Sequence, residues 1–224
     1  MLAPNVKIIV LLGVMIGGAI IVGTSDARLP GNDQGYAPVQ PIAYSHRLHA
    51  SELGIDCRYC HYGAETSPSA GIPPTSVCMT CHTSVTASGD TLRAEKARAD
   101  AAGEKPRRVF SSEIEKLYEY LGLDENAKPK PGATPKPIPW IRVHDLPDYV
   151  YFDHRPHVGR MECQACHGPV ETMERVRQET SLSMGWCVEC HRINVPGTGG
   201  VLLPGQEHPR ADHHVSTDCS VCHY

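Results

Sequence analysis

A five-residue pattern, Cys-x-x-Cys-His, occurs five times in this chain of 224 residues. The copies lie at residues 57–61, 78–82, 163–167, 187–191 and 219–223, and are called motifs 1 to 5 below. The pattern is the attachment signature of c-type haem, because two thiols can bond to the vinyl groups of one porphyrin while the next imidazole binds its iron. It predicts five covalent haem c groups, held by Cys57, Cys60, Cys78, Cys81, Cys163, Cys166, Cys187, Cys190, Cys219 and Cys222.

Zinc binding is the main alternative explanation for paired cysteines, but zinc sites usually use two pairs for each metal ion. Five pairs cannot be divided in that way, and every pair here is followed by histidine. All 10 cysteines belong to the motifs, so none remains for a disulfide, a thiolate nucleophile or a Cys-ligated iron–sulfur cluster. The predicted redox chemistry is therefore that of haem alone.

The composition indicates a fold with little regular structure. With 41% hydrophobic but only 6% aromatic residues, the chain is poor in material for two ordinary cores, and its 20 Gly and 19 Pro favour loops. Porphyrins would supply the remaining apolar interior. We therefore expect a mostly irregular and α-helical multihaem cytochrome c with little sheet. The net charge of −4, without a basic stripe among aromatic residues, gives no support for nucleic-acid binding.

An apolar run at residues 8–23 is uncharged and is preceded by Lys7. A retained single-pass anchor and a cleaved signal peptide are both compatible with such a run, and only a partial cleavage site follows it. We expect a transmembrane helix at residues 1–24. The expected location is the cytoplasmic membrane, with the haem-bearing part on the periplasmic or outer side.

An internal repeat divides the rest of the chain. Residues 44–49 precede motif 1 and residues 152–157 precede motif 3, and both read aromatic-x-His-Arg-x-His. We predict a dihaem module at 25–90 and a trihaem module at 141–224, both resembling class III cytochromes c. The insertion at 91–140 is expected to contain an exposed helix near 90–102, an amphipathic helix from about Ser112 to Gly122 that packs on the haem-bearing body, and an extended proline-rich segment.

Five haems need ten axial ligands if every iron is six-coordinate. The motifs themselves provide His61, His82, His167, His191 and His223. Histidines three residues apart can diverge onto two neighbouring haems. We therefore expect His46 and His49 to serve the haems of motifs 1 and 2, and His154 and His157 to serve those of motifs 3 and 4.

The fifth distal ligand is open to several residues. We favour His144, because an imidazole in its apolar segment would be costly to bury without a partner. His208, His213 and His214 precede motif 5 in a polar context, and Met184 is a thioether alternative that would raise the potential of its haem.

An iron held by protein on both faces has no open position for a substrate, so bis-His ligation predicts electron transfer without a substrate-converting site. Two other functions remain: a stand-alone membrane-anchored quinol dehydrogenase, and a small-molecule reductase with one five-coordinate haem. Purification as a stable multi-subunit complex would favour an electron-transfer subunit over the stand-alone dehydrogenase. A substantial high-spin haem population would favour the reductase.

The order of these features resembles one family. The N-terminal apolar run, the two-plus-three haem motifs, WIRVHDLPDYVYFDHRPHV before motif 3 and SMGWCVECHR around motif 4 are similar to the pentahaem subunit of alternative complex III. The resemblance implies a subunit of a quinol-oxidising membrane complex. Its partners would be an iron–sulfur subunit, quinol-binding membrane subunits, a monohaem cytochrome c and a soluble electron acceptor.

Overall fold

The computed structural model describes residues 11–17, 33–193 and 215–224. Short helices alternate with long irregular segments. They are η1 (a π-helix, Arg47–Glu52), α2 (Cys57–Cys60), α3 (Thr75–His82), α4 (Gly89–Ala102), α5 (Ser112–Leu121), α6 (Gln164–His167), η2 (a 3₁₀-helix, Val170–Thr172), α7 (Met184–Ile193) and α8 (Cys219–Cys222). Within the described residues, β-structure is limited to isolated bridges. The prediction of a mostly irregular, helical chain with little sheet is confirmed.

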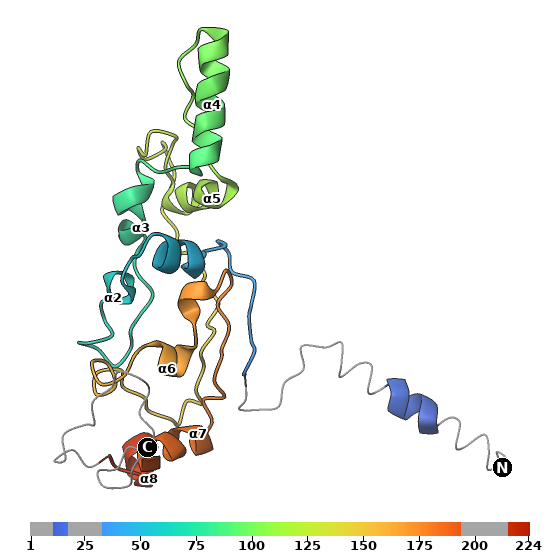
Figure 1. Cartoon of the computed structure of the whole chain (residues 1–224), viewed down its shortest axis with the longest axis vertical. Helices are drawn as coiled ribbons and strands as arrows, with labels where there is room; N and C mark the ends of the chain where they lie inside the picture. Colours follow the sequence, from blue (N-terminus) through green and yellow to red (C-terminus); the bar gives the residue numbers. More distant parts are fainter. Residues whose placement is uncertain (1–10, 18–32, 194–214) are drawn as a thin grey trace.

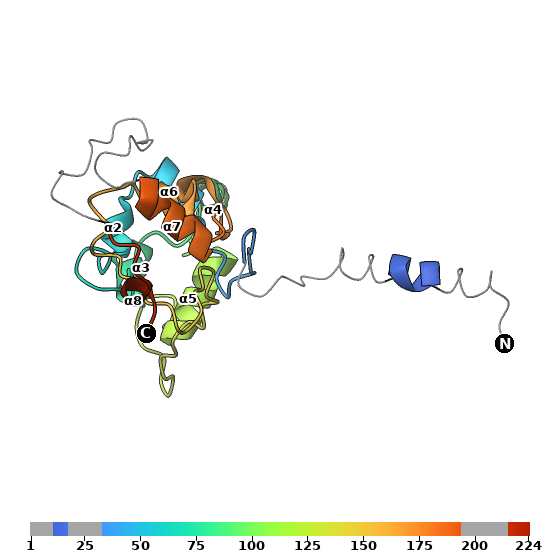
Figure 2. The ribbon, with the colours of Figure 1, turned by 90° about the horizontal axis from the view of Figure 1, so that it is seen from below.

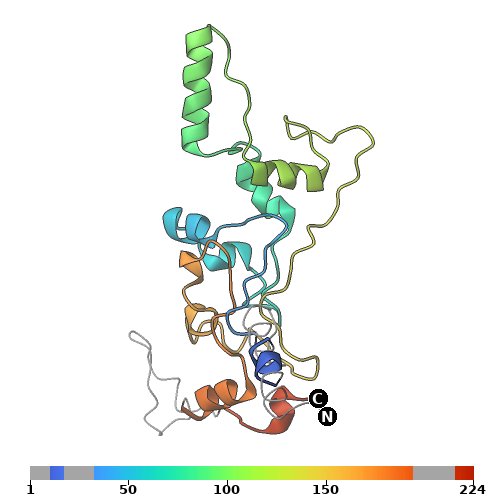
Figure 3. The same cartoon turned by 90° about the vertical axis from the view of Figure 1, so that its right-hand side faces the viewer.

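The molecule is elongated, and its helices follow one another along the longest axis. Figure 1 shows α4 at one end, then α5 and α3, then α2 and α6, with α7 and α8 at the other end. A view turned by a quarter about this axis keeps the same order (Figure 3). Seen along the axis, helices α2 to α8 project onto one small area (Figure 2). The helices that carry the five motifs therefore form a column.

Few of the chain's own side chains form a core. Among the described residues, the buried hydrophobic side chains are Ile42, Ala64, Ala87, Ala99, Leu117, Tyr118 and Met173. Three of these are alanines, which bury little area. Large apolar groups near the motifs, such as Tyr59, Tyr62 and Tyr149, are instead more than half exposed. The interior predicted from composition is thus not supplied by ordinary side-chain packing.

The predicted helix of the insertion is confirmed as α5. Ser111 caps its N-terminus by accepting a hydrogen bond from the Ile114 amide, and Gly122 ends it in the left-handed conformation at φ 64°. Leu117 and Tyr118 are its buried residues. The Tyr118 hydroxyl donates to the main-chain carbonyl of His82 at 2.8 Å. The apolar face of α5 therefore packs on the haem-bearing body, next to motif 2, as predicted.

The other parts of the insertion also agree with the sequence prediction. Helix α4 starts at Gly89, after the cap residue Ser88, and ends before Gly103 at φ 65°. Within it, the Glu95 carboxylate is 8% exposed and pairs with the guanidinium of Arg98 at 2.8 Å. Residues 130–140, beyond α5, contain no helix or strand.

The segments around the two copies of the repeat interlock. Helix η1, from the first copy, contacts η2, which follows motif 3. The Arg47 amide donates to the carbonyl of Met173 at 3.1 Å, and the His154 amide donates to the carbonyl of Pro68 at 3.1 Å. Residues that precede each pair of motifs are therefore held by residues from the other half of the chain.

The structure contradicts the membrane anchor that was predicted from the sequence. No helix in the described parts of the chain has both the length and the apolar character needed to cross a bilayer. Of the predicted anchor, residues 11–17 are described and are helical. The other residues of the predicted anchor at 1–24 lie outside the described residues. The transmembrane helix and the single-pass location in the cytoplasmic membrane, both predicted from the sequence, are therefore wrong.

Candidate haem sites

Each motif lies on a short helix that brings its two cysteines to one face. Residues three apart are neighbours on a helix surface, which is the spacing within every Cys-x-x-Cys pair. In motif 1, the Asp56 side chain caps α2 by accepting a hydrogen bond from the Arg58 amide at 2.8 Å. In motif 3, Cys163 is the cap residue of α6 and already has helical backbone angles. Local helix formation thus presents both thiols together.

Main-chain carbonyls orient four of the five motif histidines. In each case Nδ1 lies within hydrogen-bonding distance of a carbonyl oxygen: Gly71 for His61 (2.7 Å), Val85 for His82 (2.7 Å), Ser216 for His191 (2.8 Å) and Tyr149 for His223 (3.3 Å). A carbonyl can only accept, so Nδ1 carries the proton and Nε2 keeps its lone pair. These imidazoles are in the tautomer that binds a metal through Nε2.

The histidine of motif 3 differs from the other four. The Nδ1 atom of His167 lies 3.2 Å from Nε2 of His144, and the two rings are nearly perpendicular at 82°. Their centres are 4.4 Å apart, which is too close for a metal ion between the facing nitrogens. His144 therefore takes the place that a carbonyl has at the other motifs.

Second histidines face the motif histidines at a characteristic spacing. A metal ion lies about 2 Å from a bonded imidazole nitrogen, so two imidazoles on opposite sides of one metal have ring centres roughly 6 Å apart. Among the described residues, three such pairs occur, at 6.1 Å for His49 and His82, 6.4 Å for His154 and His167, and 6.2 Å for His157 and His191. The donor set and its spacing fit iron held between two imidazoles.

The remaining histidine of the first repeat copy lies near motif 1. Burial, followed by the charges of His61 and His49, lowers the pKa of His46 to about 4. Its Nδ1 is buried and has no hydrogen-bond partner within the described residues. The structure thus brings each histidine of the two repeat copies close to a different motif histidine. The ligand roles assigned to them remain predictions.

The two copies of the repeat have the same geometry. The aromatic residue stacks on the second histidine, at 4.4 Å and 23° for Tyr44 on His49 and at 4.7 Å and 29° for Phe152 on His157. In both copies it meets the first histidine edge-on at 4.9 Å. The sequence pattern contained this aromatic position, but its role in holding the second imidazole was not predicted.

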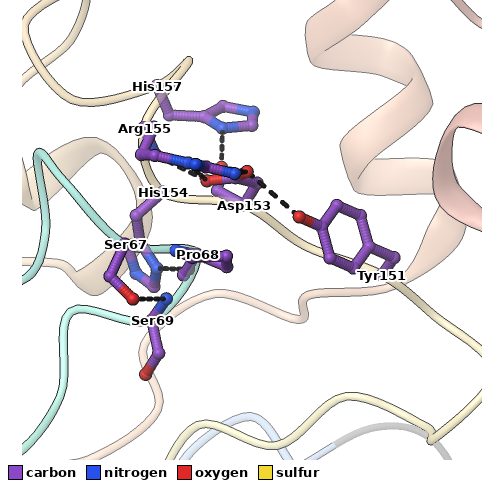
Figure 4. A network of polar contacts seen from close by, with 8 residues as sticks. All are labelled: Ser67, Pro68, Ser69, Tyr151, Asp153, His154, Arg155 and His157. Carbon is purple, nitrogen blue, oxygen red and sulfur yellow. Dashed lines mark hydrogen bonds and ion pairs between the residues drawn. The ribbon is translucent and has the colours of Figure 1, made fainter.

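Figure 4 shows how the second copy is fixed. His154 directs Nδ1 to the carbonyl of Pro68 at 2.8 Å, and His157 directs Nδ1 to the carbonyl of Asp153 at 2.8 Å. The Asp153 carboxylate is in turn paired with the guanidinium of Arg155 at 2.5 Å. Both imidazoles therefore keep Nε2 free for a metal. In the first copy, His49 does the same by directing Nδ1 to the carbonyl of Ser45 at 2.8 Å.

Two half-buried histidines have a lowered pKa. Burial, followed by the charges of His144, His154 and His61, lowers the pKa of His167 to about 4. Burial also lowers the pKa of His157, against the opposing hydrogen bond to the Asp153 main chain. Only a neutral imidazole can bind a metal ion. The environment of these rings therefore favours the ligating form.

Thiols of successive motifs lie close together and give the order of the first three motifs. Burial raises the pKa of Cys60 in motif 1, and the charge of Cys78 in motif 2 raises it further. Burial also raises the pKa of Cys163 in motif 3, where the charge of Cys57 and a side-chain hydrogen bond to it add to the effect. Motif 1 is therefore next to both motif 2 and motif 3.

The same relation continues toward the C-terminus. Burial raises the pKa of Cys166 in motif 3 to about 11, with the charges of Cys190 and Cys187 in motif 4 as the next causes. Burial raises the pKa of Cys187, and the charge of Cys222 in motif 5 raises it further. Together with the helix order in Figure 1, this places the motifs in the spatial order 2, 1, 3, 4, 5.

The fifth distal position stays a prediction. His208, His213 and His214 lie outside the described residues, and Met184 at the start of α7 is 69% exposed. His144 is in contact with His167, as described above. Beside motif 5, the ring of Tyr149 stacks on that of His223, with centres 5.8 Å apart.

A simple zinc centre is not assembled in the described part of the chain. No group of three or more His, Cys, Asp or Glu side chains there is arranged to hold a metal ion by itself. A structural zinc site needs four such ligands. Pairs of imidazoles beside pairs of thiols suit a metal whose other ligands come from a macrocycle.

A glycine directly after motif 3 is predicted to be essential for the local backbone. Gly168 has φ 70° and ψ −169°, and a Cβ atom there would lie 2.5 Å from Cγ of Glu179. We expect Gly168→Ala to lower the free energy of unfolding of the haem-loaded protein by about 1–3 kcal/mol, measured by denaturant titration. Gly185→Ala is the control, because its nearest heavy atom, Ser183 Oγ, is 4.0 Å away. Equal losses in the two variants would contradict the prediction.

No protein-family model matches the chain. A curated relative is the multiheme cytochrome c subunit of menaquinone reductase from Nitratidesulfovibrio vulgaris, which is 30% identical over 128 residues. The match covers 57% of this chain and 45% of the relative, so the chain spans about half the length of the relative. This similarity supports a multihaem cytochrome c with covalently bound haem c.

Proposed function

We propose that the chain is a pentahaem electron-transfer subunit of a quinone-linked oxidoreductase complex. The observation that carries the proposal is the column of motifs in which motif histidines face second imidazoles at 6.1 to 6.4 Å. The five copies of the motif support a number of five cofactors. Haem, when bound, supplies a one-electron centre at each motif.

The chain's residues hold these centres and protect them from substrates. The ten motif cysteines would bond to the porphyrins, and the motif histidines would bind iron on one face. His46, His49, His154 and His157 would bind the opposite face at motifs 1 to 4. With protein nitrogen on both faces, the iron there offers no position to a small molecule. Outer-sphere electron exchange between neighbouring sites is the chemistry that remains.

The column suits relay between two partners at its ends. One end is motif 2, against which α5 packs, and the other is motif 5. The relative's name links a similar subunit to menaquinone, and the motif order resembles the pentahaem subunit of alternative complex III. We assign quinone chemistry to partner subunits, with an iron–sulfur subunit, a monohaem cytochrome c and a soluble acceptor as further members of the electron path.

Native purification with haem counting tests the proposal. The tagged native chain should co-purify with other redox subunits, and its mass should exceed that of the polypeptide by about 3 kDa, the contribution of five thioether-linked haems. The isolated chain should not oxidise or reduce quinone. A mass without added porphyrin would overturn the haem assignment. Quinone turnover by the chain alone would overturn its role as a relay subunit.

A further inference from the structure

Motif 3 occupies the centre of the column, and its histidine has a different hydrogen-bond partner from the other motif histidines. At the other four motifs the histidine Nδ1 is directed to a main-chain carbonyl. At motif 3 the partner is a side chain, Nε2 of His144, at 3.2 Å. His167 has its second ring neighbour, His154, with ring centres 6.4 Å away and the planes only 3° apart. His167 thus lies between two imidazoles at different distances and ring angles: His144 in direct contact, and His154 at the spacing of an opposite ligand.

From this arrangement we infer that His144 is a positioning residue: its Nε2 accepts a hydrogen bond from Nδ1 of His167 and thereby tunes the haem of motif 3. The inference rests on haem attachment at Cys163 and Cys166, as proposed above. His167 must bind iron through Nε2 if its Nδ1 donates to His144. His154 then lies at the spacing expected for the opposite ligand of the same iron.

The two nitrogens have defined roles in this contact. His144 accepts through the lone pair of Nε2, so its own proton is on Nδ1. That same lone pair cannot bind a second iron while the hydrogen bond exists. His144 is therefore assigned to motif 3 rather than to the open distal position at motif 5, for which it was considered from the sequence.

An imidazole acceptor affects the iron through its ligand. A hydrogen bond at Nδ1 orients the ligating ring and raises the basicity of Nε2, which stabilises ferric iron relative to ferrous iron. Loss of the acceptor is expected to raise the potential of one haem. Because motif 3 lies between motifs 1 and 4, such tuning would act on the site through which both halves of the column are connected.

The test is a redox titration of the haem-loaded full chain, with spin state measured by EPR. In His144→Ala, all haems that are low-spin in the native protein should stay low-spin, and no additional haem should bind carbon monoxide. One of five potentials should rise, by up to about tenfold in its reduction equilibrium, or about 59 mV for a one-electron couple. His144→Gln, whose amide oxygen can accept from His167, should restore most of the native potential.

Two results would overturn the inference. A new high-spin, carbon monoxide-binding haem in His144→Ala would make His144 an iron ligand. Five unchanged potentials in both variants would remove any tuning role.

If the native chain itself lacks haem at motif 3, shown by mass analysis of the peptide containing Cys163 and Cys166, the proposed function fails first, so the two failures are distinguishable. If the alanine variant does not mature, a glutamine variant with a native potential at every haem supports the acceptor role, and one with a high-spin haem contradicts it.

Discussion

Replacing His49 with alanine is expected to convert one of the five haems from a low-spin form to a high-spin form that binds carbon monoxide. His49 faces His82 with ring centres 6.1 Å apart, and its Nδ1 is directed to the Ser45 carbonyl. Alanine removes the nitrogen that we place on the second face of the motif 2 iron. About one fifth of the total haem should therefore gain an open position, as seen in carbon monoxide difference spectra and EPR.

The second copy of the repeat provides a matched test of the same assignment. His157→Ala should open one haem in the same way, at motif 4, because His157 faces His191 at 6.2 Å. Tyr44→Phe is the control: it keeps the ring that stacks on His49 and removes only the hydroxyl. Carbon monoxide-binding haem is counted as the increase over the native protein, because this difference does not depend on which ligand the haem of motif 5 has. No increase in either alanine variant would refute the bis-His assignment.

The local geometry of the motifs could largely be predicted from the sequence, because it depends on short-range patterns. The two cysteines of each motif lie on one short helix. In the repeat before motifs 1 and 3, the contacts between the aromatic ring and the two histidines all lie within six residues. Helix α5 was predictable for the same reason, since it is capped locally: its end at Gly122 was predicted, and its N-terminal cap is Ser111, one residue before the predicted Ser112. In each case, the interactions that decide the structure lie within one or two turns of the chain.

Long-range contacts were not predictable from these patterns. The spatial order of the motifs is 2, 1, 3, because Cys57 rather than a thiol of motif 2 meets Cys163. His154 is held by the carbonyl of Pro68, 86 residues away in sequence. Main-chain carbonyls leave no signal in the sequence, because every residue has one. The partner of His144 depends equally on tertiary packing, which motif spacing does not contain.

The error about the N-terminus has a related cause. Hydropathy at residues 8–23 reports how a segment partitions between water and lipid, but not whether it forms one continuous helix. An apolar run of 16 residues was already short for a bilayer, and its length was extended with flanking residues to reach the usual span.

Removing the haem of motif 3 is expected to reduce electron flow through the assembled complex to the background rate. In the double variant Cys163→Ala and Cys166→Ala, the chain loses the site that lies between motif 1 and motif 4. Motifs 2 and 1 then remain as one group, and motifs 4 and 5 as another. The expected loss follows from the column being linear, because no other motif adjoins both groups. Quinone-linked reduction of the acceptor, measured in the purified complex, checks this result.

A second double variant, Cys78→Ala and Cys81→Ala, is the matched control, because it also removes one haem but from the end of the column. Charges interact strongly only between close sites, so a missing haem should shift the potentials of its neighbours alone. The motif 3 variant should therefore change two of the four remaining potentials, and the motif 2 variant only one. Turnover near the native rate without motif 3, or equal numbers of shifted potentials in the two variants, would be incompatible with the order 2, 1, 3, 4, 5.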